Sequence, residues 1–214
     1  MSETSVMIKA GENLLESLLE KGEVASVVAV ICHPHPLYGG SMDNGVVSTV
    51  QKSLRKWGWG TLRFNFRGVG RSTGTYGDGE KEAEDVQSVA SYLFEQGVKE
   101  LHLAGYSFGA WVVLKALELG LEPASLILIS PPIDFMEFSH LKLSSKPSLI
   151  TLGDRDDFCS FDSLQKWLAV QPSVAGFTQV EALPNCDHFY GGNDVALADK
   201  ISEFLRRNFK RGAA

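Results

Sequence analysis

Short apolar runs alternate with amphipathic segments along the chain, and this alternation constrains the fold more than any other feature. The run at 24–32 (VASVVAVIC) is rich in β-branched residues and is apolar on both faces, as expected of a central strand that helices cover on both sides. Similar runs predict further strands at 60–66, 100–105, 125–130, 148–152 and, with the alternation of an edge strand, 177–183.

Helices are predicted between these strands, where apolar residues recur three or four positions apart. Such stripes occupy 46–57, 86–93 and 197–205, and a helical segment, AWVVLKALELG, follows the strand at 100–105. Near the start, LLESLLE could form a helix, but Val6-Met7-Ile8 followed by Ala-Gly-Glu-Asn favours a strand entering a hairpin turn. The whole pattern predicts a mostly parallel, twisted α/β sheet with helices on both faces, whose functional site lies at the carboxyl ends of the strands.

Length and charge exclude several classes of protein. A chain of 214 residues with 44% hydrophobic and 21% charged residues predicts one globular domain, 1–214, with an N-terminal hairpin at about 4–22. The net charge of −6 and the lack of a basic cluster argue against nucleic acid and anionic membranes as partners. The longest apolar run is about half of the ~20 residues that span a bilayer.

The location is predicted from the N-terminus and the cysteines. The N-terminus, Met-Ser-Glu-Thr, lacks the cationic and apolar regions of a signal peptide. The three cysteines are widely spaced and do not form a disulfide framework. We therefore expect a cytoplasmic protein with reduced thiols, and the oligomeric state is left open.

Ser107 is the candidate nucleophile. It lies in Gly105-Tyr106-Ser107-Phe108-Gly109, a G-x-S-x-G sequence between a predicted strand and a predicted helix. In that context the turn strains the serine backbone and exposes its hydroxyl above the sheet, and neighbouring segments pack against both glycines. The N–H of Phe108, at the start of the helix, is expected to stabilise a developing oxyanion. The alternative is an ordinary strand–helix turn with small residues.

His188 is the candidate base among the five histidines. It follows the last predicted strand and precedes the terminal helix, where the chain order Ser, Asp, His of this type of site puts the base. His102 falls inside a predicted strand, and His140 lies in a polar loop without a supporting pattern. A solvated loop histidine is the alternative interpretation of His188.

The orienting acid is expected in the loop after the strand at 148–152, which reads Gly-Asp-Arg-Asp-Asp. Alternation of side-chain direction makes Asp154 and Asp156 point to similar sides and Asp157 elsewhere. We select Asp156, with Asp154 and Asp157 as alternatives. Asp187 is adjacent to the histidine in sequence, but successive side chains diverge and it cannot easily reach the ring.

Three stretches together carry a family resemblance: HPHPLYGGSMDN at 33–44, NFRGVGRSTG at 65–74 and GYSFG at 105–109. They resemble the small bacterial members of the α/β-hydrolase superfamily that lack a lid domain, and the resemblance spans roughly 24–209. It implies an α/β-hydrolase fold without a cap domain. It also implies Ser107 as nucleophile, Asp156 as acid and His188 as base.

The resemblance further implies a second oxyanion amide in the loop 33–40, at Leu37, with Tyr38 as the alternative. Commoner members carry a single His-Gly where this chain has His-Pro-His-Pro, so the residue that supplies this donor can differ from Leu37 by one or two positions. Tyr38 and Tyr106 are the residues that we expect to contact substrate.

Metal and cofactor sites are less favoured by the sequence. His33 and His35 could bind a metal with the acidic loop, but no third ligand stands at a known spacing. Gly68-Val69-Gly70 is not followed by a third glycine at the spacing of a dinucleotide-binding loop, nor by a predicted helix. We expect Arg67 and Ser72 to stabilise that loop by hydrogen bonds instead. We therefore expect no metal and no cofactor.

The substrate class is predicted from a short connection. Residues 131–147 are too few for a helical cap, so the pocket should be open and suited to small esters with short acyl chains. Phe135, Met136, Phe138 and Leu141 in this connection either form an apolar wall or pack on the sheet. A serine hydrolase that cleaves carboxylic esters is the leading prediction. Thioester or small-amide hydrolysis by the same triad, and a non-catalytic binding protein on this fold, are the alternatives.

Overall fold

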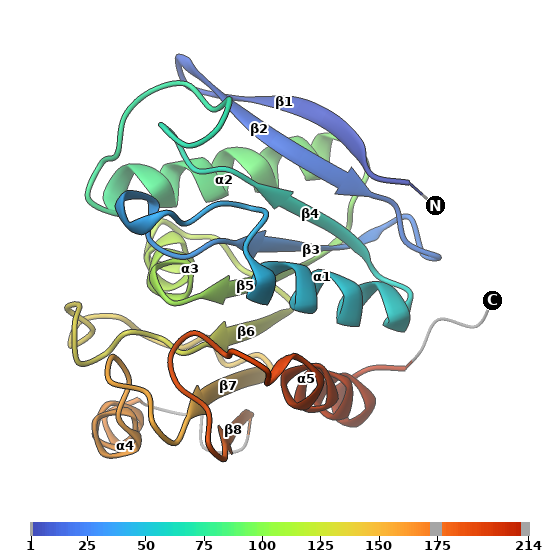
Figure 1. The fold of residues 1–214 in the computed structure, drawn as a ribbon. Coiled ribbons are helices and arrows are strands. Elements are labelled where there is room, and N and C mark those ends of the chain that lie inside the picture. Colours follow the sequence, from blue (N-terminus) through green and yellow to red (C-terminus); the bar gives the residue numbers. More distant parts are fainter. Residues whose placement is uncertain (1, 172–176, 211–214) are drawn as a thin grey trace.

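Eight strands form one sheet in the computed structural model, which describes residues 2–171 and 177–210 (Figure 1). The strand order is β1-β2-β4-β3-β5-β6-β7-β8, antiparallel at β1/β2 and β2/β4 and parallel at every other pair. The strands are β1 Thr4–Ala10, β2 Asn13–Glu20, β3 Val27–Cys32, β4 Gly60–Phe64, β5 Glu100–Tyr106, β6 Ser125–Ile129, β7 Ser148–Gly153 and β8 Thr178–Leu183.

Two layers of helices cover the sheet. α1 (Gly45–Trp57) and α5 (Asp194–Asn208) pack on one face, and α2 (Glu80–Glu95), α3 (Phe108–Glu118) and α4 (Phe161–Ala169) pack on the other (Figure 1). In β3, Val28, Val30 and Cys32 enter one core, while Ala29 and Ile31 enter the other. The central strand is therefore apolar on both faces, as predicted.

The remaining elements agree with the sequence in type and differ at their ends. The LLESLLE segment is strand β2, which pairs with β1 across a turn at Gly11. β8 lies at the edge of the sheet, as its alternation predicted. β3 begins only at Val27, because the Val27 N–H closes a turn onto the carbonyl of Val24. Helix α4 has no counterpart among the predicted helices.

The sheet brings the carboxyl ends of its parallel strands to one side of the molecule, the left in Figure 1. The loops that follow β3, β5, β7 and β8 therefore meet there. A short 3₁₀ helix, η1 (Pro36–Tyr38), lies in the first of these loops. In the described ranges, no helix combines the length and apolarity that crossing a bilayer requires.

Candidate active site

Ser107 sits on a strained turn between β5 and α3. Its backbone has φ 53° and ψ −120°, a conformation that residues with a side chain rarely adopt. A Cβ at Gly105 would lie 2.4 Å from the carbonyl oxygen of Gly109, and a Cβ at Gly109 would lie 2.4 Å from that of Cys32. Both glycines of the G-x-S-x-G sequence are thus required by close backbone contacts, as the sequence predicted.

The structure brings Ser107, His188 and Asp156 together. The Ser107 hydroxyl lies 2.8 Å from His188 Nε2, and His188 Nδ1 lies 2.9 and 3.1 Å from the two carboxylate oxygens of Asp156. An ionised carboxylate only accepts hydrogen bonds, so Nδ1 carries the proton and Nε2 accepts from the serine hydroxyl. This arrangement can take a proton from Ser107 and stabilise the resulting charge.

Asp156 is selected from its acidic loop by backbone hydrogen bonds. Its Oδ1 accepts from the N–H groups of Phe158 and Cys159 at 2.9 and 3.0 Å, and its side chain is fully buried. Asp154 instead accepts from the Cys186 N–H at 3.2 Å, and Asp157 is exposed to solvent. Of the three neighbouring carboxylates, only that of Asp156 reaches the histidine ring.

Two buried tyrosines, Tyr106 and Tyr190, hold the loop that carries His188 in position. The Tyr106 hydroxyl donates to the His188 carbonyl at 2.8 Å, and burial raises the pKa of this phenol well above its ordinary value. Tyr190, two residues after the histidine, is fully buried, with its hydroxyl at 3.1 Å from Ser130 Oγ and 2.9 Å from Thr151 Oγ1. The sequence did not single out Tyr190, because an aromatic residue in a loop carries no signal of its own.

The loop after β3 is held by His33. Its Nε2 accepts the Phe66 N–H at 3.0 Å, which leaves the proton on Nδ1 for donation to the Pro34 carbonyl at 2.6 Å. Burial lowers the pKa of His33 to about 4, so the ring is neutral at ordinary pH. Because the Pro34–His35 peptide is trans, the His35 N–H points away from the carbonyl that His33 binds.

The structure differs from the sequence prediction at Leu37. Its N–H donates to His35 Nδ1 at 3.2 Å, and its side chain is 66% exposed and outside the cavity lining. The Tyr38 N–H bonds to the His35 carbonyl at 3.1 Å, although the Tyr38 ring does line the cavity. The N–H groups of His35 and Phe108, one in each of the two segments that flank Ser107, form no hydrogen bond with another group of the described residues.

The competing sequence interpretations have structural explanations. The ring nitrogens of His35 contact the Leu37 N–H and the Tyr76 hydroxyl, and burial lowers its pKa. Among the described residues, no group of three or more His, Cys, Asp or Glu side chains could hold a metal ion. Arg67 forms a buried salt bridge with Asp85 at 2.7 Å, and the Ser72 hydroxyl donates to the Asn65 carbonyl. These contacts stabilise the loop, as expected.

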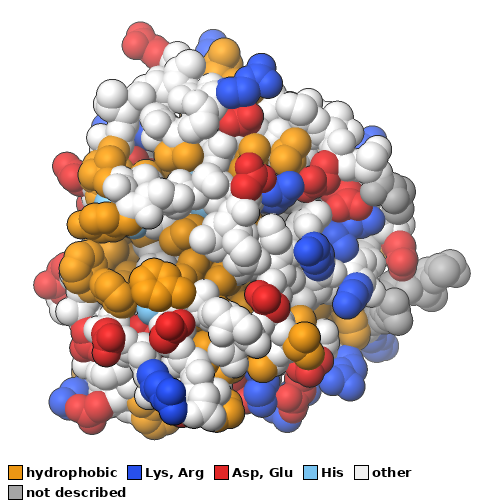
Figure 2. All heavy atoms as spheres, viewed as in Figure 1, with side chains coloured by type: hydrophobic (Ala, Val, Ile, Leu, Met, Phe, Trp, Pro, Cys, Tyr) orange, Lys and Arg blue, Asp and Glu red, His pale blue; other side chains and the backbone are white. Residues whose placement is uncertain are grey.

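An apolar cavity of about 600 Å³ opens in front of Ser107. Phe135 and Met136 line it, whereas Phe138 and Leu141 are buried in the core, so the connection 131–147 serves both roles considered for it. Figure 2 shows hydrophobic side chains gathered at this side of the molecule, with histidine visible between them. The lining consists of Pro34, His35, Tyr38, Gly39, Gly40, Asn44, Tyr106, Ser107, Phe108, Pro132, Phe135, Met136, Phe158, His188 and Phe189.

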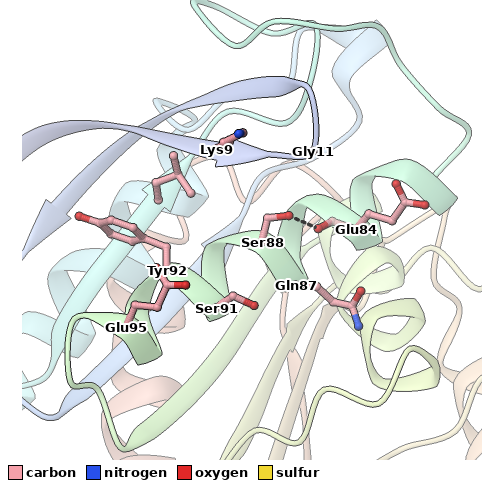
Figure 3. Close-up of a pocket in the computed structure, with 9 residues that line it drawn as sticks. Lys9, Gly11, Glu84, Gln87, Ser88, Ser91, Tyr92 and Glu95 are labelled. Atoms are coloured by element: carbon pink, nitrogen blue, oxygen red, sulfur yellow. Dashed lines mark hydrogen bonds between the residues drawn. The ribbon is translucent and has the colours of Figure 1, made fainter.

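A second cavity of about 600 Å³ lies between the β1–β2 hairpin and α2 (Figure 3). Most of the residues that line it have polar side chains, among them Lys9, Glu84 and Glu95. The Ser88 hydroxyl donates to the backbone carbonyl of Glu84 within the helix, and the described residues that line the cavity include no histidine. It therefore offers no activated nucleophile, and the cavity at Ser107 is the candidate active site.

Known proteins, among them the three that follow, resemble this chain over most of its length; no family model matches the chain. A serine hydrolase from Xanthomonas campestris described as having no lid is 30% identical, with a TM-score of 0.90 and coverage of 100% of this chain and 98% of that one. An α/β serine hydrolase homologue from Coxiella burnetii is 32% identical, with a TM-score of 0.86 and coverage of 96% and 98%. An uncharacterized protein of Rickettsia prowazekii is 30% identical over 185 residues, which cover 83% of this chain and 78% of that protein.

The fold, the turn at Ser107 and these similarities define the class. The chain belongs to the α/β-hydrolase superfamily. Within it, the chain is similar to lidless bacterial serine hydrolases, and its β6–β7 connection contains no helix.

Proposed function

We propose that the protein is a serine hydrolase that cleaves small carboxylic esters with short acyl chains through an acyl-enzyme intermediate. The observation that carries the proposal is the continuous hydrogen-bonded chain from the Ser107 hydroxyl through His188 to Asp156, placed at an apolar cavity. Each member sits at the carboxyl end of a different strand or the turn after it, so the sheet holds them in register.

In the first half-reaction, Ser107 Oγ attacks the ester carbonyl carbon while its proton passes to His188 Nε2. The carbonyl oxygen becomes an oxyanion. The C–O bond to the alcohol then breaks, His188 returns the proton to the departing oxygen, and the acyl group stays on Ser107. In the second half, water attacks the acyl carbon and gives a proton to His188. The bond between that carbon and Ser107 Oγ then breaks, Ser107 recovers the proton from His188, and the carboxylic acid is released.

The oxyanion requires two donors, and we assign the N–H groups of Phe108 and His35. Phe108 is the first residue of α3, where an N–H has no acceptor within the helix. The His35 N–H is directed by its peptide, whose carbonyl His33 holds on the opposite side. Preorganised donors of this kind typically contribute about 3–4 kcal/mol each to transition-state stabilisation.

The size of the substrate is inferred from the connection 131–147. This segment contains neither helix nor strand, so it adds no helical cap over the cavity. Tyr38 and Phe189, at 76% and 69% exposure, leave the rim in contact with water. A long acyl chain would gain little burial in such a site.

A fluorophosphonate probe tests the proposal directly. The probe should form a stoichiometric adduct on Ser107, located by mass spectrometry of the digested protein, and short para-nitrophenyl esters should be hydrolysed. An adduct without ester turnover would direct attention to thioesters or amides. The absence of both adduct and turnover would favour a binding protein on this fold.

A further inference from the structure

Three phenylalanine rings stand together beside His188. The Phe158 ring lies 4.5 Å from the His188 ring, centroid to centroid. Phe135 packs edge-to-face on Phe158 at 5.5 Å, and Phe189 does so at 6.5 Å. The three rings come from separate segments, the β6–β7 connection, the loop after β7 and the loop after β8. They line one side of the cavity and are called the phenylalanine wall below.

Backbone hydrogen bonds hold the wall in place. The Phe158 N–H donates to Asp156 Oδ1 at 2.9 Å, and its carbonyl accepts the Asp134 N–H at 3.1 Å. The Phe189 N–H is bound by the Asp187 carboxylate at 2.9 Å. Even so, the Phe135 and Phe189 residues are 57% and 69% exposed. The wall is thus a preorganised aromatic surface facing an open cavity, and such exposed apolar patches mark binding sites.

The position of the wall decides which part of an ester it contacts. His188 Nε2 returns its proton to the departing oxygen, so the alcohol portion of the substrate must lie on the histidine side of Ser107. Phe158 and Phe189, like Tyr106, have rings in contact with His188 and line the cavity, and the Tyr106 hydroxyl is already bound to the His188 carbonyl. Among the described residues that line the cavity there is no Asp, Glu, Lys or Arg, so a charged alcohol would find no counter-ion in them.

We propose that the phenylalanine wall is the alcohol subsite and that it binds a neutral aromatic alcohol, so that the preferred substrates are esters of arylalkyl alcohols. The inference rests on the ester hydrolysis proposed above. Edge-to-face pairing favours an aromatic partner over a saturated ring of the same size, because ring edges and faces attract beyond the effect of buried area. The reaction balances as before: the ester C–O bond breaks, and the arylalkyl alcohol leaves with the proton from His188.

The test compares 2-phenylethyl acetate with 2-cyclohexylethyl acetate. The two esters share the acyl group and the number of carbons, and their alcohols are of nearly equal acidity, so only the ring differs. We expect kcat/KM of the wild-type protein to be about 3- to 10-fold higher for the phenyl ester. Phe189→Leu and Phe158→Leu should bring this ratio close to one. Phe161→Leu is the matched control, because Phe161 is 53% exposed but lies on α4 outside the cavity, and it should keep the ratio.

Each other outcome has a defined meaning. Equal kcat/KM for the two acetates would overturn the aromatic subsite and leave the ester hydrolase proposal standing. A preference that survives both wall substitutions would place the alcohol elsewhere and overturn it as well. If neither acetate is cleaved, the inference fails; a Ser107 adduct with fluorophosphonate would then retain the serine hydrolase, and its absence would remove that too.

Discussion

The Tyr106 hydroxyl donates a 2.8 Å hydrogen bond to the backbone carbonyl of His188, and so connects the turn that carries Ser107 to the loop that carries His188. Tyr106 is only 4% exposed, so its phenol acts on the position of His188 rather than on solvent. Tyr106→Phe should lower kcat by about 3- to 10-fold, the effect of one lost hydrogen bond, with KM little changed. Steady-state kinetics would show this, with Tyr92→Phe on α2 as the control; a raised KM at constant kcat would indicate a substrate contact instead.

Ser107 should separate activity from stability. Ser107→Ala and Ser107→Gly should both reduce esterase activity by roughly 10⁴-fold or more. Glycine tolerates the positive φ at this turn and alanine does not, so the glycine variant should be more stable by about 1 kcal/mol. Urea unfolding of the two inactive variants measures the difference. Equal stability of the pair would argue that the turn carries no strain.

The acidic loop offers a matched series of substitutions. Asp156→Asn should lower kcat by several powers of ten, because the amide cannot hold His188 in the tautomer that accepts the serine proton. Asp157→Asn should have little effect, because this carboxylate is exposed. Asp154→Asn should cost little, since its oxygen can still accept the Cys186 N–H. A larger loss in Asp154→Asn than in Asp156→Asn would contradict the assigned roles.

Buried histidines should make the protein sensitive to mild acid. Burial lowers the pKa of His102 to about 3 and that of His33 to about 4, from an ordinary value near 6.5. As pH falls, these histidines are therefore protonated in the unfolded chain before they are protonated in the folded protein. Their contribution to the free energy of unfolding is fully present above a pH of about 6.5 and decreases as pH falls towards 4. Each histidine contributes a slope of about 1.4 kcal/mol per pH unit in this range.

His102→Phe tests this slope while preserving the stacking on Trp59, whose ring centroid is 3.6 Å from that of His102. The free energy of unfolding should be measured in urea at several pH values between 4 and 6.5. Its slope against pH should be smaller in the variant than in the wild type by the amount that one proton contributes. An unchanged slope would show that His102 is protonated in the folded protein.

Acyl-chain length tests the open site. Acetate to butyrate esters should be the best substrates, because methylenes left in water gain none of the roughly 0.8 kcal/mol that burial of each would give. No jump in rate is expected above the solubility limit of the substrate. A preference for decanoate or longer esters would mean that Phe135, Met136 and their neighbours form a cover.

Much of the fold could be predicted because periodicity and burial coincide. Each predicted strand exists, and even the ambiguous LLESLLE segment is a strand, because the Gly11 turn pairs it with β1. Helix α4 was missed because only Leu164 and Trp167 in it are buried, which leaves a weak stripe. The periodicity of apolar residues in a sequence reveals helices and strands that bury a broad face, and it does not reveal those that bury only a few side chains.

Those candidate site residues whose position depends on the order of strands along the chain could be predicted from the sequence. Those whose position depends on hydrogen bonds within a loop were harder to predict. Ser107 and His188 follow from their places after strands. Asp156 could be preferred by alternation, but its selection depends on the N–H groups of Phe158 and Cys159, which no spacing reveals. The N–H of His35, which we assign to the oxyanion, is oriented by the hydrogen bond of His33 to the Pro34 carbonyl, and the sequence alone does not reveal that hydrogen bond.

The order of the strands has a consequence for how the protein loses activity on heating. Asp156 and His188 follow β7 and β8, and β8 is an edge strand of which only Leu183 is fully buried. Edge elements with few buried side chains open at lower free energy than the centre of a sheet. Local opening of β8 would withdraw His188, while Ser107, in the turn directly after the central strand β5, would keep its place. Inactivation should therefore precede the global melting of the sheet.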